Sequence, residues 1–242
     1  MSFDASYHVN NLSGLTFDFM NGRILLENPV GRGAYGYIYR GRDISRPKHE
    51  QTLYAVKCIE MPTPGTLRHT IFETELAVLD MLGDHPNILT FHGAAYHSPH
   101  VFLLLDLCEG GDLFNAATRT DYFANEDAVR NTFLQILNAV QYCHSNGVYH
   151  RDLKPDNVLF SKHGHVYLAD FGLSTMEPTT YITGVGTKAY MSPECLGEDI
   201  LCVGFDNGPN DVWALGVLLL NILTCKMPWP RAAYHNVNYS AF

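Results

Sequence analysis

The sequence predicts an α+β fold in which a β-rich first part precedes a mainly helical second part. In the first part, Tyr37–Arg40 and Tyr54–Ile59 are rich in strand-forming residues, and Val101–Leu107 is a largely apolar run typical of a buried strand. In the second part, Asn125–Ser145 repeats apolar residues at helical spacing, with Asn125 as its cap. The uncharged run Val212–Leu223 is too short to span a bilayer and predicts a buried helix.

Composition excludes several classes of protein. The chain has 242 residues, of which 46% are hydrophobic, so it can form one unit or two small lobes. Its formal net charge of −9 disfavours non-specific nucleic-acid binding. The six cysteines form no C-x-x-C pair, and Met1–Met20 lacks the layout of a signal peptide. We therefore expect a monomeric protein of the cytoplasm or nucleus that binds neither nucleic acid nor membrane.

Two motifs lie close together in the second part. His150–Asn157 reads H-R-D-L-K-P-D-N, and Asp170–Gly172 reads D-F-G. A carboxylate beside a lysine suits the activation of a hydroxyl, and Asn and Asp oxygens are hard ligands suited to Mg²⁺. At this spacing the motifs resemble the catalytic and magnesium-binding loops of the eukaryotic protein kinase family. The resemblance implies a two-lobed fold, with ATP and Mg²⁺ as cofactors.

The family resemblance also implies roles for individual residues. Asp152 would orient the substrate hydroxyl and accept its proton, and Lys154 would reach the transferred phosphate. Lysine at this position is typical of kinases that act on Ser or Thr. Asn157 and Asp170 would hold Mg²⁺, and Thr187 would bridge Asp152 and Lys154.

A glycine-rich stretch occurs near the start of the first part. Gly31–Ile38 reads G-x-G-x-x-G-x-I, which also occurs in dinucleotide-binding folds. There the motif opens a helix, whereas Tyr37–Arg40 alternates like a strand. We therefore expect a strand-turn-strand flap whose backbone N–H groups approach phosphates, with a simple hairpin turn as the alternative.

Lys57 lies inside an apolar strand and needs a partner. By resemblance to the V-A-I-K strand of kinases, it would hold the ATP phosphates and pair with a glutamate on the helix expected over Arg68–Leu82. Glu75 has apolar residues three and four positions away, so we expect it to face inward, whereas Glu73 is expected to be solvated.

The remaining nucleotide contacts follow from the family alignment. The hinge between the lobes would include Cys108, Leu105 would lie at the back of the adenine pocket, and Asp112 would lie near the ribose or the peptide. The resemblance assigns nucleotide contacts to Val30, Gly31, Gly33, Gly36, Ile38, Ala55, Lys57, Leu105, Asp106, Cys108, Asp112 and Leu159.

The family pattern also predicts the domain organisation. We expect an N-terminal extension over residues 1–21, an N-lobe over 22–105 and an incomplete C-lobe over 106–242. Kinases normally continue through further helices, so the C-lobe is expected to lack its last helices in a C-terminally truncated chain. Those helices normally supply an arginine to Glu194, and Arg231 does not align with it.

The favoured function is an ATP-dependent protein serine/threonine kinase that uses Mg²⁺ and acts on protein substrates. The sequences Val166–Thr175 and Tyr190–Gly197 resemble a fungal group of kinases in meiosis and nutrient signalling. Asp112 and Asp156 match positions at which some kinases have acidic side chains that contact a basic substrate residue upstream of the target hydroxyl. The resemblance therefore implies a preference for basic peptides. The alternative is a non-catalytic or inactive truncated kinase-like module that binds nucleotide or partners. A small-molecule kinase is disfavoured by the long segment that ends at Thr187.

Overall fold

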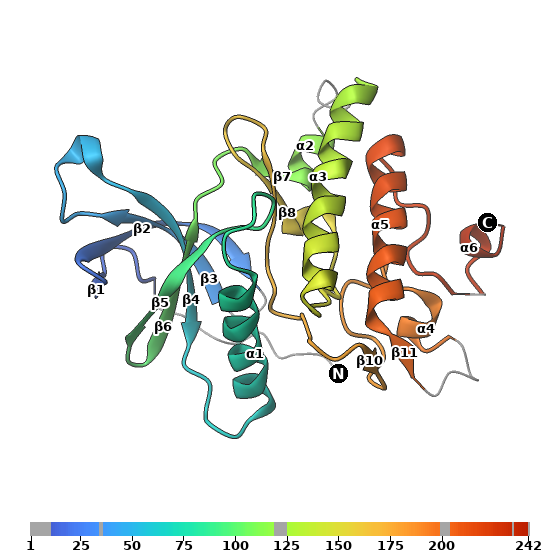
Figure 1. The fold of residues 1–242 in the computed structure, drawn as a ribbon, viewed down its shortest axis with the longest axis horizontal. Coiled ribbons are helices and arrows are strands. Elements are labelled where there is room, and N and C mark those ends of the chain that lie inside the picture. Colours follow the sequence, from blue (N-terminus) through green and yellow to red (C-terminus); the bar gives the residue numbers. More distant parts are fainter. Residues whose placement is uncertain (1–10, 34–35, 119–124, 199–203, 234, 242) are drawn as a thin grey trace. The chain divides into compact units, whose positions relative to one another are not determined.

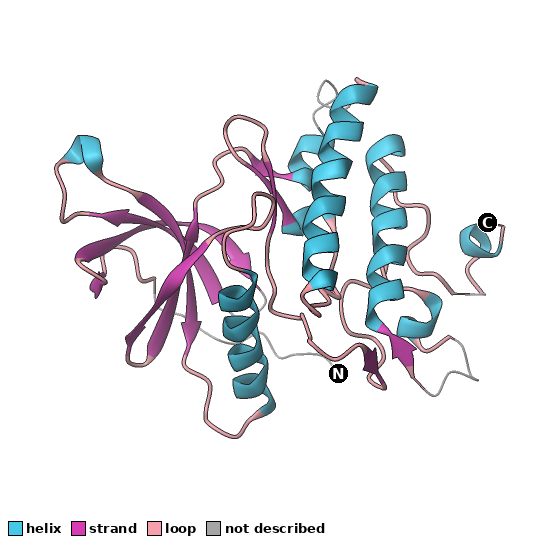
Figure 2. Cartoon of the chain, in the orientation of Figure 1, coloured by secondary structure: helices cyan, strands magenta, loops and turns pink. Residues whose placement is uncertain are grey.

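The computed structural model describes residues 11–33, 36–118, 125–198, 204–233 and 235–241 (Figure 1). The chain divides into two compact units, one formed by Met1–Pro64 with Thr90–Leu107 and the other by Gly65–Leu89 with Cys108–Phe242. The large sheet belongs to the first unit, and every α-helix of the described residues belongs to the second (Figure 2). The predicted α+β fold, with a β-rich first part and a helical second part, is confirmed.

The first unit is built on a six-stranded antiparallel sheet with the order β1-β2-β3-β4-β6-β5. Its elements are β1 (Thr16–Phe19), β2 (Gly22–Gly33), β3 (Gly36–Asp43), the 3-10 turn η1 (Lys48–Glu50), β4 (Leu53–Glu60), β5 (Phe91–His97) and β6 (His100–Asp106). The two edge strands, β1 and β5, contact each other, so the sheet curls until its edges meet. An added Cβ on Gly93 of β5 would lie 3.3 Å from the Phe19 ring, so a side chain there would require this ring to move by a few tenths of an ångström.

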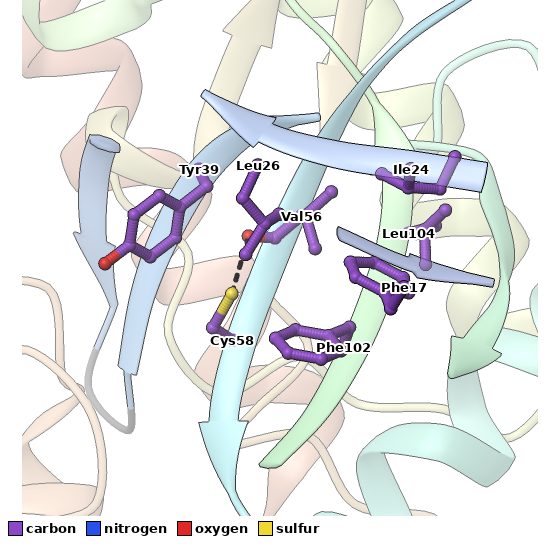
Figure 3. Close-up of a cluster of buried hydrophobic side chains, with 8 residues drawn as sticks. All are labelled: Phe17, Ile24, Leu26, Tyr39, Val56, Cys58, Phe102 and Leu104. Atoms are coloured by element: carbon purple, nitrogen blue, oxygen red, sulfur yellow. Dashed lines mark hydrogen bonds between the residues drawn. The ribbon is translucent and has the colours of Figure 1, made fainter. Parts of the chain in front are cut away.

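One face of this sheet buries an apolar cluster. Figure 3 shows its eight members: Phe17, Ile24, Leu26, Tyr39, Val56, Cys58, Phe102 and Leu104. The Phe17 and Phe102 rings are stacked with their centroids 4.3 Å apart. The Cys58 Sγ donates to the Val56 carbonyl at 3.7 Å. Alternation along the strands places these residues on one face, as the period of two predicts.

Part of the chain before Gly22, where we expected an N-terminal extension over residues 1–21, joins the sheet of the first unit. Thr16–Phe19 pairs with β2 as strand β1. The Leu12 N–H donates to the Tyr39 hydroxyl at 3.1 Å, and Phe17 joins the buried cluster. The alternation of apolar and polar residues over Leu15–Phe19 is short, and the turn residues around it conceal the strand.

The second unit is mainly helical. Its elements are α1 (Leu67–Leu82), β7 (Gly111–Asp112), α2 (Leu113–Thr118), α3 (Glu126–Ser145), the 3-10 turn η2 (Pro155–Asn157), β8 (Val158–Phe160), β9 (Val166–Leu168), β10 (Thr179–Thr180), α4 (Pro193–Leu196), β11 (Phe205–Asp206), α5 (Asn207–Thr224) and α6 (Val237–Ser240). Helices α3 and α5 lie side by side, and β7-β8-β9 form a small sheet beside α3 (Figure 1). By its contacts α1 groups with this unit. The lobe boundaries expected from the family pattern stay a prediction.

Helix α3 begins where the sequence predicts, because the Asn125 side chain accepts from the Asp127 N–H. Its buried face differs in part from the predicted one. Leu137, one of the apolar residues repeated along this helix, is 36% exposed, whereas Thr132 is buried. At 100° per residue, Leu137 lies about 100° from Ile136 and away from Thr132, so it falls outside the buried arc.

Helix α5 contains the predicted apolar run, but that run is not buried throughout. Val212 and Leu223 are each 59% exposed, whereas Leu218 is fully buried. Within the described residues, no helix is both long and apolar enough to cross a membrane.

Candidate active site

The loop between α3 and η2 is held by one buried carboxylate. Asp211 is fully buried on α5, and its two oxygens accept the backbone N–H groups of His150 and Arg151, each at 2.8 Å. The His144 Nε2–H donates to the same carboxylate at 2.9 Å. Three donors thus satisfy a charge that would be costly to bury alone. Arg151 has a φ of 65°, a left-handed conformation that these contacts maintain.

His150 is a packing residue with a defined tautomer. Its Nε2–H donates to the Ala169 carbonyl at 3.0 Å, and its Nδ1 accepts the Asp152 N–H at 3.3 Å. The ring lies 5.0 Å from that of Phe171, centroid to centroid. His150 therefore links the H-R-D loop to the D-F-G stretch, and its nitrogens are not available to act as a base.

The carboxylate of the predicted proton acceptor Asp152 has three side-chain partners, of which the Asn157 amide is the most distant, with its Nδ2 donating to Asp152 Oδ2 at 3.4 Å. Lys154 Nζ donates to Asp152 Oδ2 at 2.6 Å, and the Thr187 hydroxyl donates to Asp152 Oδ1 at 2.7 Å. Lys154 Nζ also lies 3.1 Å from the Thr187 hydroxyl. Asp152 is 8% exposed, so it is buried but can still be reached from solvent. The structure therefore brings together three of the predicted catalytic residues.

Thr187 reaches Asp152 because a glycine precedes it. Gly186 has a φ of 114°, and an added Cβ would lie 2.4 Å from the Arg151 carbonyl oxygen. A side chain at this position would push the segment away from the loop. The sequence reasoning did not single out Gly186, although its place directly before Thr187 was the available signal.

The two predicted metal ligands lie at the ends of neighbouring elements. Asn157 ends η2, and its Nδ2 donates to the backbone carbonyl of Asp152 at 2.8 Å. This contact uses the nitrogen end of the amide, which leaves the oxygen as the end that can bind a cation. Asp170 follows β9, has a φ of 59° and is exposed. The Ala169 N–H donates to the Asn157 carbonyl at 2.9 Å and so joins the two ligand positions through the backbone.

One amide oxygen and one exposed carboxylate fit Mg²⁺ better than a transition metal. Mg²⁺ is usually bound through one or two carboxylates together with waters and substrate phosphates. Over the described ranges, no group of three or more His, Cys, Asp or Glu residues could hold a metal ion by itself. The donor set thus matches a metal that arrives with a nucleotide.

The glycine-rich stretch forms a hairpin in the first unit. β2 ends at Gly33, β3 begins at Gly36, and these two residues pair. Residues 34–35 lie outside the described part. A strand follows the motif, which excludes the dinucleotide-binding alternative. An added Cβ at Gly36 would lie 1.9 Å from the Cys58 carbonyl oxygen, so this glycine is required by the neighbouring strand and not only by a phosphate.

Lys57 lies beneath this hairpin. It is 4% exposed in β4, between Ile38 on one neighbouring strand and Leu103 on the other. An added Cβ at Gly33 would lie 3.7 Å from Lys57 Cε, at ordinary contact distance. Within the first unit, the predicted phosphate-binding lysine and the predicted phosphate-binding loop are therefore adjacent.

Glu75 and Glu73 on α1 lie in the environments that helical spacing predicts. Glu75 is 3% exposed among the buried residues of the helix. Glu73 is exposed and forms an ion pair with His69 one turn earlier, at 3.2 Å. Lys57 and Glu75 belong to different units, and their pairing stays a prediction.

The predicted adenine strand is β6 in the first unit. Leu105 pairs with Ala55 on β4, and Asp106 follows it. The His92 Nε2–H donates to Asp106 Oδ1 at 2.7 Å, and this hydrogen bond holds the pKa of the Asp106 carboxyl below its usual range. Of the other predicted contacts in this unit, Val30 is 55% exposed.

Three predicted contacts lie in the second unit. Cys108 is half-buried. Asp112 of β7 pairs with Leu159 of β8. Both Asp112 oxygens are already in use, because one accepts the Asn115 N–H at 2.7 Å and the other accepts the Asn115 side-chain amide at 3.0 Å. Asp112 therefore caps α2, a local role that the sequence reasoning did not assign.

Glu194 has a different environment from the one familiar in the kinase family. Across the described ranges, no ion pair involves Glu194, and Arg231 instead pairs with Glu198. The neighbouring Ser192 is fully buried, and its N–H and hydroxyl both donate to Asn210 Oδ1, at 3.1 and 2.9 Å. Asn210 was not predicted, although its place directly before Asp211 was a usable signal.

Comparison with known proteins gives consistent matches. A profile described as "Protein kinase domain" matches residues 25–241. The chain is 39% identical, over 84% of its length, to the "Negative regulator of sexual conjugation and meiosis" of Schizosaccharomyces pombe. It is 33% identical to "Serine/threonine-protein kinase ksp1" of the same yeast over 84% of its length, and to "CBL-interacting protein kinase 9" of Oryza sativa over 86%.

These relatives are longer than the chain. The chain spans 47%, 44% and 45% of their respective lengths. The resemblance to a fungal regulator of meiosis, predicted from the residues around the D-F-G and S-P-E stretches, is confirmed.

Proposed function

The chain belongs to the protein kinase domain family, and from this membership we propose that it transfers phosphate from ATP to Ser or Thr hydroxyls of proteins. One observation carries the proposal. Asp152, Lys154 and Thr187 come from two segments of the chain and meet through hydrogen bonds of 2.6 to 3.1 Å. A lysine and a hydroxyl that both donate to one carboxylate hold that carboxylate in a fixed orientation, as a proton acceptor requires.

Each residue of this group has a part in the proposed reaction. Asp152 orients the attacking hydroxyl and accepts its proton, while Lys154 places positive charge beside the phosphoryl group in transit. Lys57 binds the ATP phosphates beneath the hairpin. Asn157 and Asp170 hold Mg²⁺, which supplies neutralisation of the phosphate charge when it is bound.

The proposed substrate is a protein segment with basic residues near the target. Asp156 is exposed next to the buried Asn157, so its carboxylate can meet a cation of the substrate. Asp112 contributes less than the family alignment implies, because Asn115 occupies both of its oxygens. We therefore expect Asp156→Asn to weaken a preference for basic peptides more than Asp112→Asn does.

The test of the function is phosphate transfer to a basic serine peptide with ATP and Mg²⁺. Asp152→Asn should lower the rate by about 10²–10⁴-fold, the range for loss of a general base. Asp170→Asn should also lower it, and nucleotide binding should become less dependent on Mg²⁺. Asp80→Asn, on the exposed side of α1, is the matched control and should leave the rate unchanged.

Two outcomes would contradict the proposal. If the parent chain and Asp152→Asn transfer phosphate at the same rate, the Asp152 carboxylate is not the proton acceptor. Nucleotide binding without transfer, measured as a nucleotide-dependent rise in the unfolding temperature, would favour the non-catalytic kinase-like module instead.

A further inference from the structure

The beginning of α5 carries three polar side chains that are almost fully buried: Asn207, Asn210 and Asp211. Two of them hold other segments of the chain in place. Asp211 holds the loop that leads to Asp152, and Asn210 accepts the N–H and the hydroxyl of Ser192. The beginning of α5 is therefore an anchor for segments that are distant from it in the sequence.

Asn207 binds a third segment. Its backbone N–H donates to the Pro178 carbonyl, and its side-chain Nδ2 donates to the Glu177 carbonyl, each at 2.8 Å. The contact continues where β10 pairs with β11, because the Thr179 hydroxyl donates to Asp206 Oδ1 at 2.7 Å. Three consecutive residues are thus fixed by hydrogen bonds to Asp206 and Asn207.

The segment that Asn207 holds continues to Thr187, whose hydroxyl donates to Asp152 Oδ1 at 2.7 Å. Both sides of this contact are attached to the same end of α5, the Asp152 loop through Asp211 and the Thr187 segment through Asn207. Residues four positions apart lie on one face of a helix, so Asn207 and Asp211 keep a fixed separation. The helix can therefore set how the two sides of the candidate site meet.

The side chain of Asn207 uses only one end of its amide. In the part of the chain that the structure describes, its Oδ1 is buried and has no hydrogen-bond partner. A buried acceptor without a partner destabilises a fold, and an apolar side chain of similar size would avoid this penalty. Stability alone therefore does not account for an asparagine here, whereas a need to hold the Glu177 carbonyl does.

We propose that Asn207 is a positioning residue, which holds Glu177 and Pro178 so that Thr187 reaches Asp152. The inference rests on the proposed kinase function and adds to it a residue that touches neither nucleotide nor substrate. Its role is to set the rate of the chemical step through the placement of Thr187.

The expected effect is partial, because another contact also holds this segment. The Gly184 N–H donates to the Cys195 carbonyl at 2.7 Å, at a point between Pro178 and Thr187 along the chain. Loss of the Asn207 side chain should therefore displace Thr187 rather than release it. Because a displacement of about 1 Å can lower a rate by about 10²-fold, we expect kcat to fall by about tenfold.

The experiment compares the parent chain with Asn207→Ala and Thr179→Val. Thr179 is exposed, and Thr179→Val removes its hydrogen bond to Asp206 while keeping a β-branched side chain in β10, so the fold is retained. Two controls change the same residue types at the other end of α5: Asn221→Ala for the first variant and Thr224→Val for the second.

Four quantities are measured for each protein: kcat and KM with the basic serine peptide, nucleotide binding from the rise in the unfolding temperature, and amide hydrogen exchange over residues 177–187. Asn207→Ala should lower kcat by about tenfold and Thr179→Val by about twofold to threefold. KM and nucleotide binding should stay at the parental values, while exchange over residues 177–187 becomes faster. Both controls should behave like the parent chain.

A merely structural Asn207 gives a different result. Asn207→Ala would then lower the unfolding temperature but keep the parental kcat wherever the protein is folded, which overturns the inference and leaves the kinase function intact. If Asn207→Ala does not fold, Thr179→Val decides, and a parental kcat in that variant overturns the inference. If the parent chain shows no transfer that depends on Asp152, the kinase function itself fails, and the role of Asn207 fails with it.

Discussion

The two units of the chain bury different kinds of side chain. In the first unit, the described buried residues are almost all apolar, with Asp43 and Lys57 as the polar exceptions. In the second unit the buried polar residues are Glu75, Asn87, Thr132, His150, Asp152, Asn157, Ser174, Thr180, Ser192, Asn207, Asn210 and Asp211. The catalytic candidates of the second unit therefore lie among these buried polar residues, which we call the polar interior, within a core that is otherwise mainly apolar.

This difference reflects how each interior is held together. Apolar burial is non-directional, so the sheet of the first unit depends mainly on the volume and placement of its side chains. A buried polar group needs a particular partner, and loss of one partner leaves the other unsatisfied. Asn87 illustrates this in the second unit, because it bonds Gln135, Val166 and Asn138 at 2.9 to 3.1 Å.

The largest expected effect comes from breaking the polar interior at Asp211. Asp211→Ala removes the acceptor for the N–H groups of His150 and Arg151 and leaves His144 without its partner. The free energy of unfolding should fall by about 3–5 kcal/mol, the usual cost of removing one partner of a buried charged group. Urea denaturation followed by circular dichroism measures this change.

Val212→Ala is the matched control for Asp211→Ala, because Val212 is the next residue of α5 and is 59% exposed. Its effect should stay within about 0.5 kcal/mol. If Asp211→Ala lowered the free energy of unfolding no more than Val212→Ala does, the hydrogen bonds of Asp211 to the loop at His150 and Arg151 would not stabilise the second unit.

The corresponding change in the first unit is Phe17→Ala. Phe17 is 6% exposed and stacks on Phe102, so its truncation should lower the free energy of unfolding by about 3 kcal/mol through lost burial and a residual cavity. Met20→Ala, three residues further on and 78% exposed, is the control. A loss below about 0.5 kcal/mol for Phe17→Ala would mean that β1 adds little to the sheet.

The contrast between the units also explains what could be predicted from the sequence. Helix α1 was expected over Arg68–Leu82 and spans Leu67–Leu82, and α3 begins after its predicted cap Asn125. Helical periodicity and caps are local signals, so they can be read without knowing the fold. The same local reasoning predicted that Glu75 is buried and Glu73 is exposed.

The sequence motifs predict much of the candidate site in the second unit. Asp152, Lys154 and Thr187 were expected to meet, and they lie within hydrogen-bonding distance. Residues 152 and 187 are too far apart along the chain for a local sequence signal to relate them. The expectation that they meet therefore came from the family resemblance. Their catalytic roles stay predictions.

The sequence could not predict partners that only the fold brings near. His144 lies on α3, and its contact with Asp211 on α5 depends on the packing of two helices. The same holds for Asn210 and Ser192, which are 18 positions apart. Strand β1 was missed for another reason, since a four-residue strand beside turn residues has too short a pattern to recognise.

The smallest expected effect is a pH dependence of the free energy of unfolding. It arises at His85, which is half-buried beside the buried Asn87. The ring of His85 stacks on Tyr142 with centroids 4.3 Å apart, and its Nδ1 accepts the Asn87 N–H at 3.2 Å. Burial lowers the pKa of His85 from its ordinary value of about 6.5. The unfolded chain therefore takes up the proton first, so this contribution to stability is present above pH of about 6.5 and declines as the pH falls below it.

His85→Phe keeps an aromatic ring on Tyr142 but removes both the titration and the acceptor. At pH 7.5 it should cost about 1 kcal/mol for the lost hydrogen bond. This cost should shrink at pH 5.5, where the parent chain has lost part of the His85 contribution. Urea unfolding of both proteins at the two pH values measures the difference, and the exposed His163→Phe reports the effect of removing an imidazole at the surface. An equal cost at both pH values would show that the polar interior around Asn87 does not depend on a neutral His85.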